Sequence, residues 1–211
     1  IVHNHGIWCP MLKESPSSVL EFWFGEEYDS CEINSAQLKR WFKKQKATDQ
    51  EIQKRFSELV ELAASDQVGW PENDAQSPLA LIIALDQFPR NIARGTSGMY
   101  RYDDKACSYA TELVQSGAHL QYKPVERIFI YLPFEHAEDL ALQDKAVHLF
   151  AGLRDEVPEK YRVAYTRTLE YAIAHQRVIR QFGRFPHRNK ILSRKSSPEE
   201  ESYLAQPGSG F

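Results

Sequence analysis

The sequence predicts an all-α fold of about eight or nine helices, and three observations lead to this prediction. Serine precedes proline at 15–16, 77–78 and 197–198, which places a helix-capping side chain before a residue suited to the first helical turn. Apolar residues recur at spacings of three and four along most of the chain. Outside one apolar stretch no run is typical of a strand, and no Asn-Gly or Asp-Gly hairpin turn occurs.

The first expected helix follows Ser15 and ends at Gly25, and a second, short helix comes after it. A third covers about residues 49–65, where Thr48 has capping-box spacing to Glu51. The aromatic residues of the first two helices have helical spacing, which predicts core packing, with a peptide-binding groove as the alternative. These residues are Phe22, Trp23, Phe24, Trp41 and Phe42.

Residues 78–88 differ in kind from the other segments. The run 79–85 is apolar on every face, which predicts a helix buried all round. A buried strand is the alternative, but the serine-proline start and the lack of alternation favour a helix. Further helices are expected over 103–117, 124–131, 138–153, 158–182 and 198–205, the last with capping-box spacing between Ser197 and Glu200.

The organisation along the chain predicts one helical domain over residues 15–205. We expect residues 1–14 to be an extension, with Met11 as the natural start, and residues 206–211 to be a tail. We therefore leave His3 and His5 out of any functional interpretation. The loop 66–77 is the only candidate boundary inside the domain. Short connections between successive helices fit an α-solenoid or an irregular bundle.

Composition excludes several classes of function. A formal net charge of −3 over 211 residues argues against a general nucleic-acid or membrane-surface binder, which needs a broad basic face. The three cysteines are few and widely spaced, which fits a reducing compartment, and we expect a cytoplasmic location. The motifs for nucleotide cofactors, P-loops and serine-hydrolase elbows are absent, so we expect no cofactor.

A short phrase occurs twice in the chain. Residues 86–91 are Asp-Gln-Phe-Pro-Arg-Asn, and residues 183–189 are Gly-Arg-Phe-Pro-His-Arg-Asn. Each copy follows an apolar helical stretch, and a second arginine comes after each Arg-Asn pair, at Arg94 and Arg194. Because proline disrupts a helix, both copies are expected to be helix ends that aim guanidinium and amide groups at a fixed place.

These arginines predict a pocket for a small anionic ligand. Arg90 and Arg94 are four residues apart, so one helical turn would place both on one face. Guanidinium groups present a planar fork of donors suited to carboxylate or phosphate. The alternative is that they pair with the protein's own acids and hold helices together. The candidate ligand-binding residues are Arg90, Asn91, Arg94, Glu135, Asp139, His175, Arg184, Arg188 and Asn189.

Three residues are candidates for proton transfer, namely Asp86, His136 and His187. Asp86 ends an apolar helix, so its carboxyl group should lie near the core, where burial tunes a general base. The alternative is a structural role at the Phe88-Pro89 turn. His187 lies within the second phrase, and an imidazole titrates near neutrality.

The segment Glu135-His136-Ala137-Glu138-Asp139 also suggests a metal site. The Glu-x-x-His spacing of di-iron bundles and the His-Glu-x-x-His motif are both absent, however, so we expect no metal. The carboxylates could instead cap a helix that starts near residue 138. His175 lies on an apolar stripe of its helix, which favours a hydrogen-bonded core histidine, although its position also lets it approach the second arginine phrase.

Longer motifs resemble a known family, the bacterial proteins that carry domain of unknown function 924. The matching phrases are Val19–Gly25, Trp41-Phe42, Leu79–Thr96, Tyr131–Asp139, Glu170–His175, Phe182–Asn189 and Ser196–Glu200. They span about residues 18–205 in the same order. The resemblance implies an all-helical α-α superhelix similar to tetratricopeptide-repeat proteins, and it implies no established activity.

Two functions from different classes follow from these observations. The first is a helical protein with an arginine-rich pocket for a small anionic metabolite, with catalysis as an additional option. The second is a tetratricopeptide-like module for a protein or peptide partner, in which the polar phrases are structural. No nucleic-acid or membrane partner is expected from the charge.

Overall fold

The computed structural model describes residues 13–71 and 73–210, and this part of the chain is all-helical, as predicted. No described residue lies in a strand. The expected extension falls outside the described residues except for 13 and 14. The α-helices are α1 (Pro16–Phe24), α2 (Ser35–Phe42), α3 (Lys46–Ala64), α4 (Ser77–Ile82), α5 (Phe88–Ile92), α6 (Asp103–Gln115), α7 (Pro124–His136), α8 (Leu140–Glu156), α9 (Glu159–Phe182) and α10 (Pro198–Leu204). The described chain also contains one π-helical turn, η1 (Ile83–Gln87), and the short 3-10 helices η2 (Ser97–Tyr100), η3 (Ala118–Gln121) and η4 (Pro186–Arg188).

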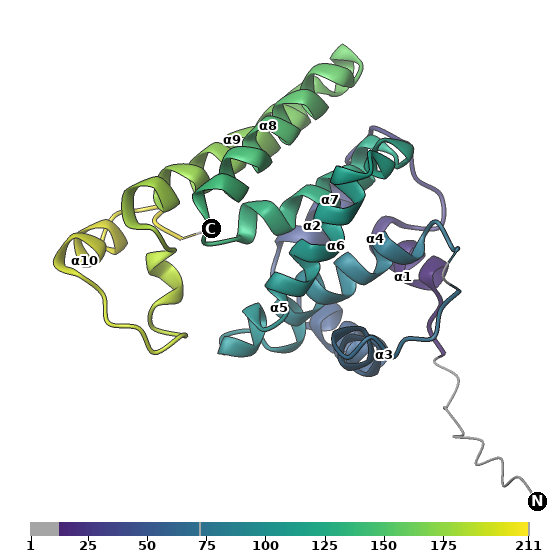
Figure 1. Ribbon diagram of the computed structural model, residues 1–211, viewed down its shortest axis with the longest axis horizontal. Helices are drawn as coiled ribbons and strands as arrows, with labels where there is room; N and C mark the ends of the chain where they lie inside the picture. Colours follow the sequence, from purple (N-terminus) through teal and green to yellow (C-terminus); the bar gives the residue numbers. More distant parts are fainter. Residues whose placement is uncertain (1–12, 72, 211) are drawn as a thin grey trace, which may run out of the picture.

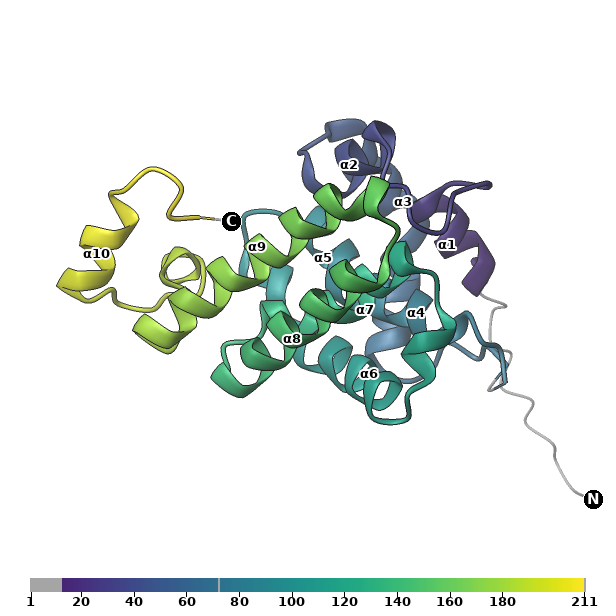
Figure 2. The same ribbon diagram turned by 90° about the horizontal axis from the view of Figure 1, so that it is seen from above.

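Helices α1 to α7 form the body of the molecule, and α8 with α9 forms a long hairpin along one side of it (Figure 1). The far end of α9 extends beyond the body and carries η4 and α10 (Figure 2). In the described part of the chain, no helix combines the length and the apolar character that crossing a bilayer requires. The resemblance to a tetratricopeptide superhelix stays a prediction.

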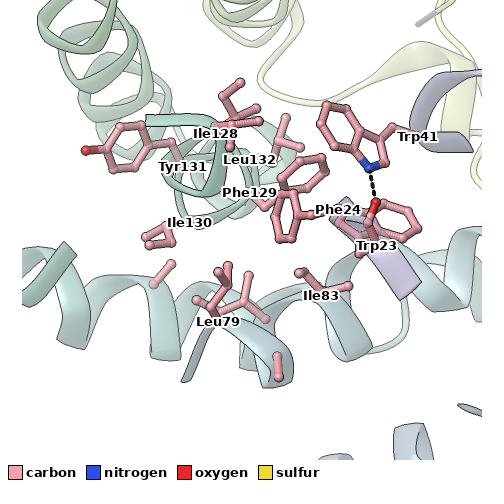
Figure 3. Packing of buried hydrophobic residues seen from close by; sticks show 14 of the residues in the cluster. Trp23, Phe24, Trp41, Leu79, Ile83, Ile128, Phe129, Ile130, Tyr131 and Leu132 are labelled. Carbon is pink, nitrogen blue, oxygen red and sulfur yellow. Dashed lines mark hydrogen bonds between the residues drawn. The ribbon is translucent and has the colours of Figure 1, made fainter. Parts of the chain in front are cut away.

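The core lies between α4, α7 and the aromatic residues of α1 and α2 (Figure 3). The apolar run 79–85 is helical and buried, as predicted, with Leu81 alone partly exposed. The indole of Trp41 donates a hydrogen bond to the backbone carbonyl of Trp23, which fixes α2 against α1. The prediction that Phe42 is a core residue is wrong, because its side chain is 57% exposed.

The first copy of the repeated phrase is not the helix end that its proline predicts. Helix α4 continues through the π-helical turn η1 into α5, so the chain stays helical across Phe88-Pro89. A π-turn is wider than an α-turn, which makes room for the proline ring that would collide with the preceding α-turn. Asp86 therefore lies inside a helix, at its widened turn. The second copy does follow a helix end, at Gly183, whose φ of 70° is left-handed.

Helix boundaries show which start signals are reliable. Ser15 and Ser197 are N-cap residues, as predicted, and the predicted capping box of Ser197 with Glu200 is present. Ser15 also forms a capping box, with Ser18. Ser77 lies inside α4, and Thr48 lies inside α3, which begins at Lys46, so both predicted caps are wrong. Of the three serine-proline pairs, those at 15–16 and 197–198 have an extended serine, as an N-cap requires, whereas Gln76 and Ser77 are already helical.

Helix α7 is longer than its prediction of 124–131, because it continues past Pro133 to His136. Gln143 of α8 supports this end: its buried side-chain amide donates to the carbonyls of Glu135 at 2.6 Å and Ala137 at 2.8 Å. Exposed carbonyls at a helix end need such partners. As a result Glu135 and His136 are held in the last turn of a rigid helix.

Candidate functional site

The widened turn η1 carries a buried carboxylate. Asp86 is fully buried, and its Oδ1 lies 2.7 Å from Nδ1 of His136 and 3.4 Å from Nη1 of Arg90. The side-chain amide of Gln87 donates to its other oxygen. Burial alone would raise the pKa of Asp86, but the Arg90 charge and the contact with His136 outweigh it and lower the pKa to about 2. The group is therefore an anion.

Two arginines, one from each repeated phrase, meet at a single carboxylate. Arg90 forms a bidentate ion pair with Asp103, with distances of 2.9 and 3.0 Å. Arg188 approaches the same carboxylate at 3.4 Å and donates to the backbone carbonyl of His136 at 3.0 Å. We call Asp86, Arg90, Asp103, His136 and Arg188 the polar cluster.

Arg188 is the least satisfied member of the polar cluster. The residue is 7% exposed, and its Nε is buried without a hydrogen-bond partner among the described residues. Its guanidinium carbon lies 4.3 Å from the ring centre of Tyr100 and 4.6 Å from that of Phe185. Burial lowers the pKa of Arg188, and the nearby Arg90 charge adds to that effect, although Asp103 opposes it. An arginine nevertheless stays charged in proteins.

His136 is oriented by Asp86 and remains neutral. Burial and the Arg90 charge lower its pKa, and they outweigh the opposing influence of Asp86. Because the carboxylate of Asp86 can only accept, the hydrogen on the imidazole is at Nδ1. No hydrogen bond to Nε2 is found within the described residues, and the side chain keeps 14% exposure. This arrangement leaves Nε2 as an available proton acceptor, like the histidine of an Asp-His dyad.

A second carboxylate and imidazole lie beside the polar cluster. Glu135 Oε1 is 3.1 Å from Nδ1 of His175, which also lies 2.9 Å from the Tyr171 carbonyl. Burial, reinforced by the negative charge of Asp86, raises the pKa of Glu135 to about 8, so this group holds its proton at neutral pH. Burial lowers the pKa of His175 to about 3. The imidazole rings of His136 and His175 are 6.4 Å apart.

Replacement of Glu135 by glutamine is expected to remove a pH dependence of stability. The pKa is about 8 in the folded protein against an ordinary 4.5, so the folded state binds this proton more tightly. The stabilisation is therefore complete below pH 4.5 and is lost as pH rises through 8. Urea unfolding at pH 6.5 and 8.5 should show a larger loss in the wild type than in Glu135→Gln. Equal losses in the two proteins would contradict the assignment.

His187 lies close to this region, although it is outside the polar cluster. Its ring packs against Phe185 with 5.5 Å between the ring centres, and burial lowers its pKa to about 4. It is therefore neutral near pH 7, and the sequence expectation of an imidazole titrating near neutrality does not hold for it. The proton-transfer role of His187 stays a prediction.

The outer arginine of the first phrase points away from the polar cluster. The prediction that Arg90 and Arg94 share a helix face is wrong, because α5 ends at Ile92. Arg94 instead forms a bidentate pair with Asp49 of α3, with distances of 3.0 and 2.8 Å, and Asn91 donates to the same carboxylate at 2.8 Å. These two residues attach α5 to α3.

The second phrase likewise attaches α10. Arg184 is bidentate to Glu200 at 2.7 and 2.8 Å, and Asn189 donates to Glu200 at 3.2 Å.

Arg194 is bidentate to Glu138 at 2.5 and 2.9 Å. Asp139 caps α8 through the Leu142 amide, as the capping alternative predicted. In these contacts the arginines pair with the protein's own acids and Asp139 caps a helix, which are the structural alternatives predicted for them from the sequence.

A hollow of about 380 Å³ opens beside the polar cluster, between α6, the end of α7 and the start of α8. Asp103 is part of its wall and so connects it to the two arginines. The other lining residues are Asp104, Cys107, Ser108, Thr111, Glu112, Pro133, Ala137 and Leu142. Asp103 could not be singled out from the sequence, because acidic residues are common in the first turn of any helix, where they stabilise the helix dipole.

The polar cluster offers no evident metal site. Within the described residues, no group of three or more histidine, cysteine, aspartate or glutamate side chains is placed to hold a metal ion. Cys107 lines the hollow, but burial raises the pKa of its thiol to about 11, which keeps it protonated. The chemistry on offer is therefore recognition by arginine and proton transfer by imidazole or carboxyl groups.

Comparison with known proteins supports the resemblance seen in the motifs. The model of a family described as bacterial proteins of unknown function (DUF924) matches residues 19–208. A solved structure of the protein of unknown function ATU0120 from Agrobacterium tumefaciens is 36% identical to the chain, with a TM-score of 0.73. The match covers 90% of this chain and 96% of that one. None of the curated proteins compared with the chain matches it.

Proposed function

The chain belongs to the DUF924 family, whose description assigns no activity, and we propose that it binds a small anionic metabolite at its polar cluster. The observation that carries the proposal is that Nε of the Arg188 guanidinium lacks a hydrogen-bond acceptor among the described residues. This guanidinium is almost completely buried, yet its Nε has no hydrogen-bond partner within the described chain and its Nη1 contact with Asp103 is long, at 3.4 Å. An oxygen of a ligand carboxylate or phosphate would supply the missing acceptor.

Energetics favour such a ligand. A buried donor without an acceptor costs about 1–3 kcal/mol, and more when the group is charged. Carboxylate and phosphate match the guanidinium fork, and hydrogen bonds between charged groups are the stronger kind. The rings of Tyr100 and Phe185 also hold the Arg188 guanidinium in place, which reduces the entropy that a ligand would have to overcome.

The two arginines have different roles in this proposal. Arg90 is already paired with Asp103 in a short bidentate geometry, so it holds that carboxylate in position. The contact from Arg188 to Asp103 is the weaker of the two and can be exchanged for a ligand oxygen. Asp103 lies in the wall of the hollow, so a ligand in the hollow would lie next to the carboxylate that Arg188 approaches. The proposed site is thus smaller than the nine residues expected from the sequence.

The interaction-module alternative has its support on a different surface. Helix α9 exposes Val163 and Tyr171, by 68% and 61%, and a hollow of about 360 Å³ lies along the same helix. Arg167, Glu170, Tyr171 and Ala174 line that hollow. A peptide partner would use this face and would not depend on the polar cluster. Substitution of Arg188 therefore separates the two candidates.

Substitution of Arg188 by glutamine is expected to abolish anion binding. We would measure the melting temperature with sulfate, oxalate and succinate. An anion at 100 times its dissociation constant stabilises by about 2.7 kcal/mol. In a chain of this size that amounts to a rise of roughly 5–10 °C. Arg94→Gln is the matched control, because Arg94 is paired with Asp49 away from the polar cluster.

The result would contradict the proposal in either of two ways. One is that none of the three anions raises the melting temperature of the wild type. The other is that Arg188→Gln responds as strongly as Arg94→Gln, which would place the bound anion elsewhere. In both cases the exposed face of α9 becomes the better candidate.

A further inference from the structure

The charges of the polar cluster are balanced before any ligand arrives. Asp86 and Asp103 contribute two negative charges, and Arg90 and Arg188 contribute two positive charges. His136 adds none, because its pKa is lowered. The neighbouring Glu135 and His175 are also neutral near pH 7, since the pKa of the carboxyl group is raised and that of the imidazole is lowered.

An anion that enters this cluster creates an excess of negative charge in a buried place. Uncompensated charge is costly there, because the effective dielectric constant is far below that of water. The outer ion pairs, Arg94 with Asp49 and Arg194 with Glu138, are already neutralised and have no positive charge to spare. Compensation therefore has to come with the ligand or from solvent, and a proton is the simplest source.

Among the neutral groups, His136 is best placed to receive that proton. Asp86 accepts from its Nδ1 and would stabilise the imidazolium that forms. Its Nε2 has no hydrogen-bond partner among the described residues, and the side chain keeps 14% exposure. His175 is less suited, because its Nδ1 already lies against the Tyr171 carbonyl and its ring is more deeply buried.

We infer that the anion enters the polar cluster together with one proton and that Nε2 of His136 holds this proton. The inference rests on the proposed function. The only bond formed is N–H at Nε2, and the proton comes from solvent or from the acid form of the ligand, so it cancels one negative charge of the anion. The same group would act as the general base if the bound molecule reacts.

The charges around His136 act on its protonation in both directions. Asp86 and Asp103 favour an imidazolium, whereas Arg90 opposes it. A bound anion shifts this balance toward the charged form, because it adds a negative charge close to Arg188 and Asp103. The titratable and charged groups that face the imidazole are Asp86 on η1, Arg90 on α5, Asp103 on α6, Glu135 on α7, His175 on α9, and His187 and Arg188 on η4.

The experiment is isothermal titration calorimetry of the full chain with sulfate, oxalate and succinate at pH 7.5. These anions are fully ionised at that pH, so any proton taken up must bind to the protein. Titrations in HEPES and in Tris give the number of protons from the difference in buffer ionisation heat. We expect uptake of close to one proton per anion, and an affinity that falls about tenfold per pH unit above neutrality.

Two variants assign the proton to a residue. His136→Gln should take up almost no proton and bind the anion more weakly. His148→Gln, on α8 and outside the polar cluster, should match the wild type. If His136→Gln does not fold, ¹⁵N NMR of histidine-labelled wild type replaces it, because the Nε2 signal of His136 must move to its imidazolium position when oxalate is added.

Each outcome decides a different point. Anion binding without proton uptake overturns this inference and leaves the proposed function intact. Proton uptake that persists in His136→Gln overturns the assignment to His136. Absence of binding for all three anions overturns the proposed function and this inference together.

Discussion

Replacement of Asp86 by alanine is expected to lower the free energy of unfolding by about 3–5 kcal/mol, as for other broken buried ion pairs. Asp86 is fully buried and accepts from both His136 and Gln87. Its loss leaves their donors without an acceptor in a buried place, and it removes one of the two negative charges that face Arg90. Urea denaturation measures the change, with the midpoint falling while the slope stays constant.

Asp86→Asn is the matched control for this substitution. Its side-chain oxygen can still accept from Nδ1 of His136, so a smaller loss than in Asp86→Ala is expected. The contribution of the Asp86 charge to stability depends on pH. The pKa of Asp86 is about 2 in the folded protein against an ordinary 3.8, so its stabilisation is complete above about pH 4 and is lost as pH falls toward 2. Both variants should lack this loss. A destabilisation below about 1 kcal/mol in Asp86→Ala would show that the pairing contributes little.

The helical architecture could be predicted from the sequence because its signals are local. Spacings of three and four, serine-proline starts and the stop at Gly25 each act within one or two turns. The burial of the run 79–85 could also be predicted, because a helix that is apolar on every face has no side suited to water. The path through Pro89 was not predictable, because a π-turn depends on packing around the helix and leaves no local pattern.

The candidate site was predicted only in part, and the reason is distance along the chain. The sequence indicates that Arg90, Arg94, Arg184 and Arg188 need acceptors, but each acceptor is set by tertiary packing. Asp49 pairs with Arg94 across 45 positions, and Asp103 meets Arg188 across 85. No spacing rule covers such separations.

The two copies of the repeated phrase have similar roles in the structure, although only part of each copy lies in the polar cluster. Each copy contributes one arginine to the polar cluster and uses its other arginines to attach a neighbouring helix. The contacts to Asp49 and Glu200 hold the backbone near Arg90 and Arg188, the two arginines of the proposed ligand site.

Replacement of Phe129 by alanine is expected to cost about 3–5 kcal/mol, the usual range for a large aromatic residue removed from a core. Phe129 is fully buried on α7, with ring centres 4.8 Å from Trp41, 5.4 Å from Phe24 and 5.6 Å from Trp23 (Figure 3). Three rings from α1 and α2 would lose one shared partner, and the cavity cannot close without moving them.

Phe42→Ala is the control for Phe129→Ala. Phe42 is the same residue type, contacts the same Trp41 ring at 6.1 Å and is 57% exposed, so its removal should change stability by no more than about 0.5 kcal/mol. Urea denaturation of the two variants compares the same phenylalanine-to-alanine change at a buried and at an exposed position. Similar losses would mean that the aromatic residues near α2 contribute through local helix contacts. A large loss in Phe129→Ala alone would identify α7 as the element to which the N-terminal helices are packed, and therefore as the support for Glu135 and His136 at its end.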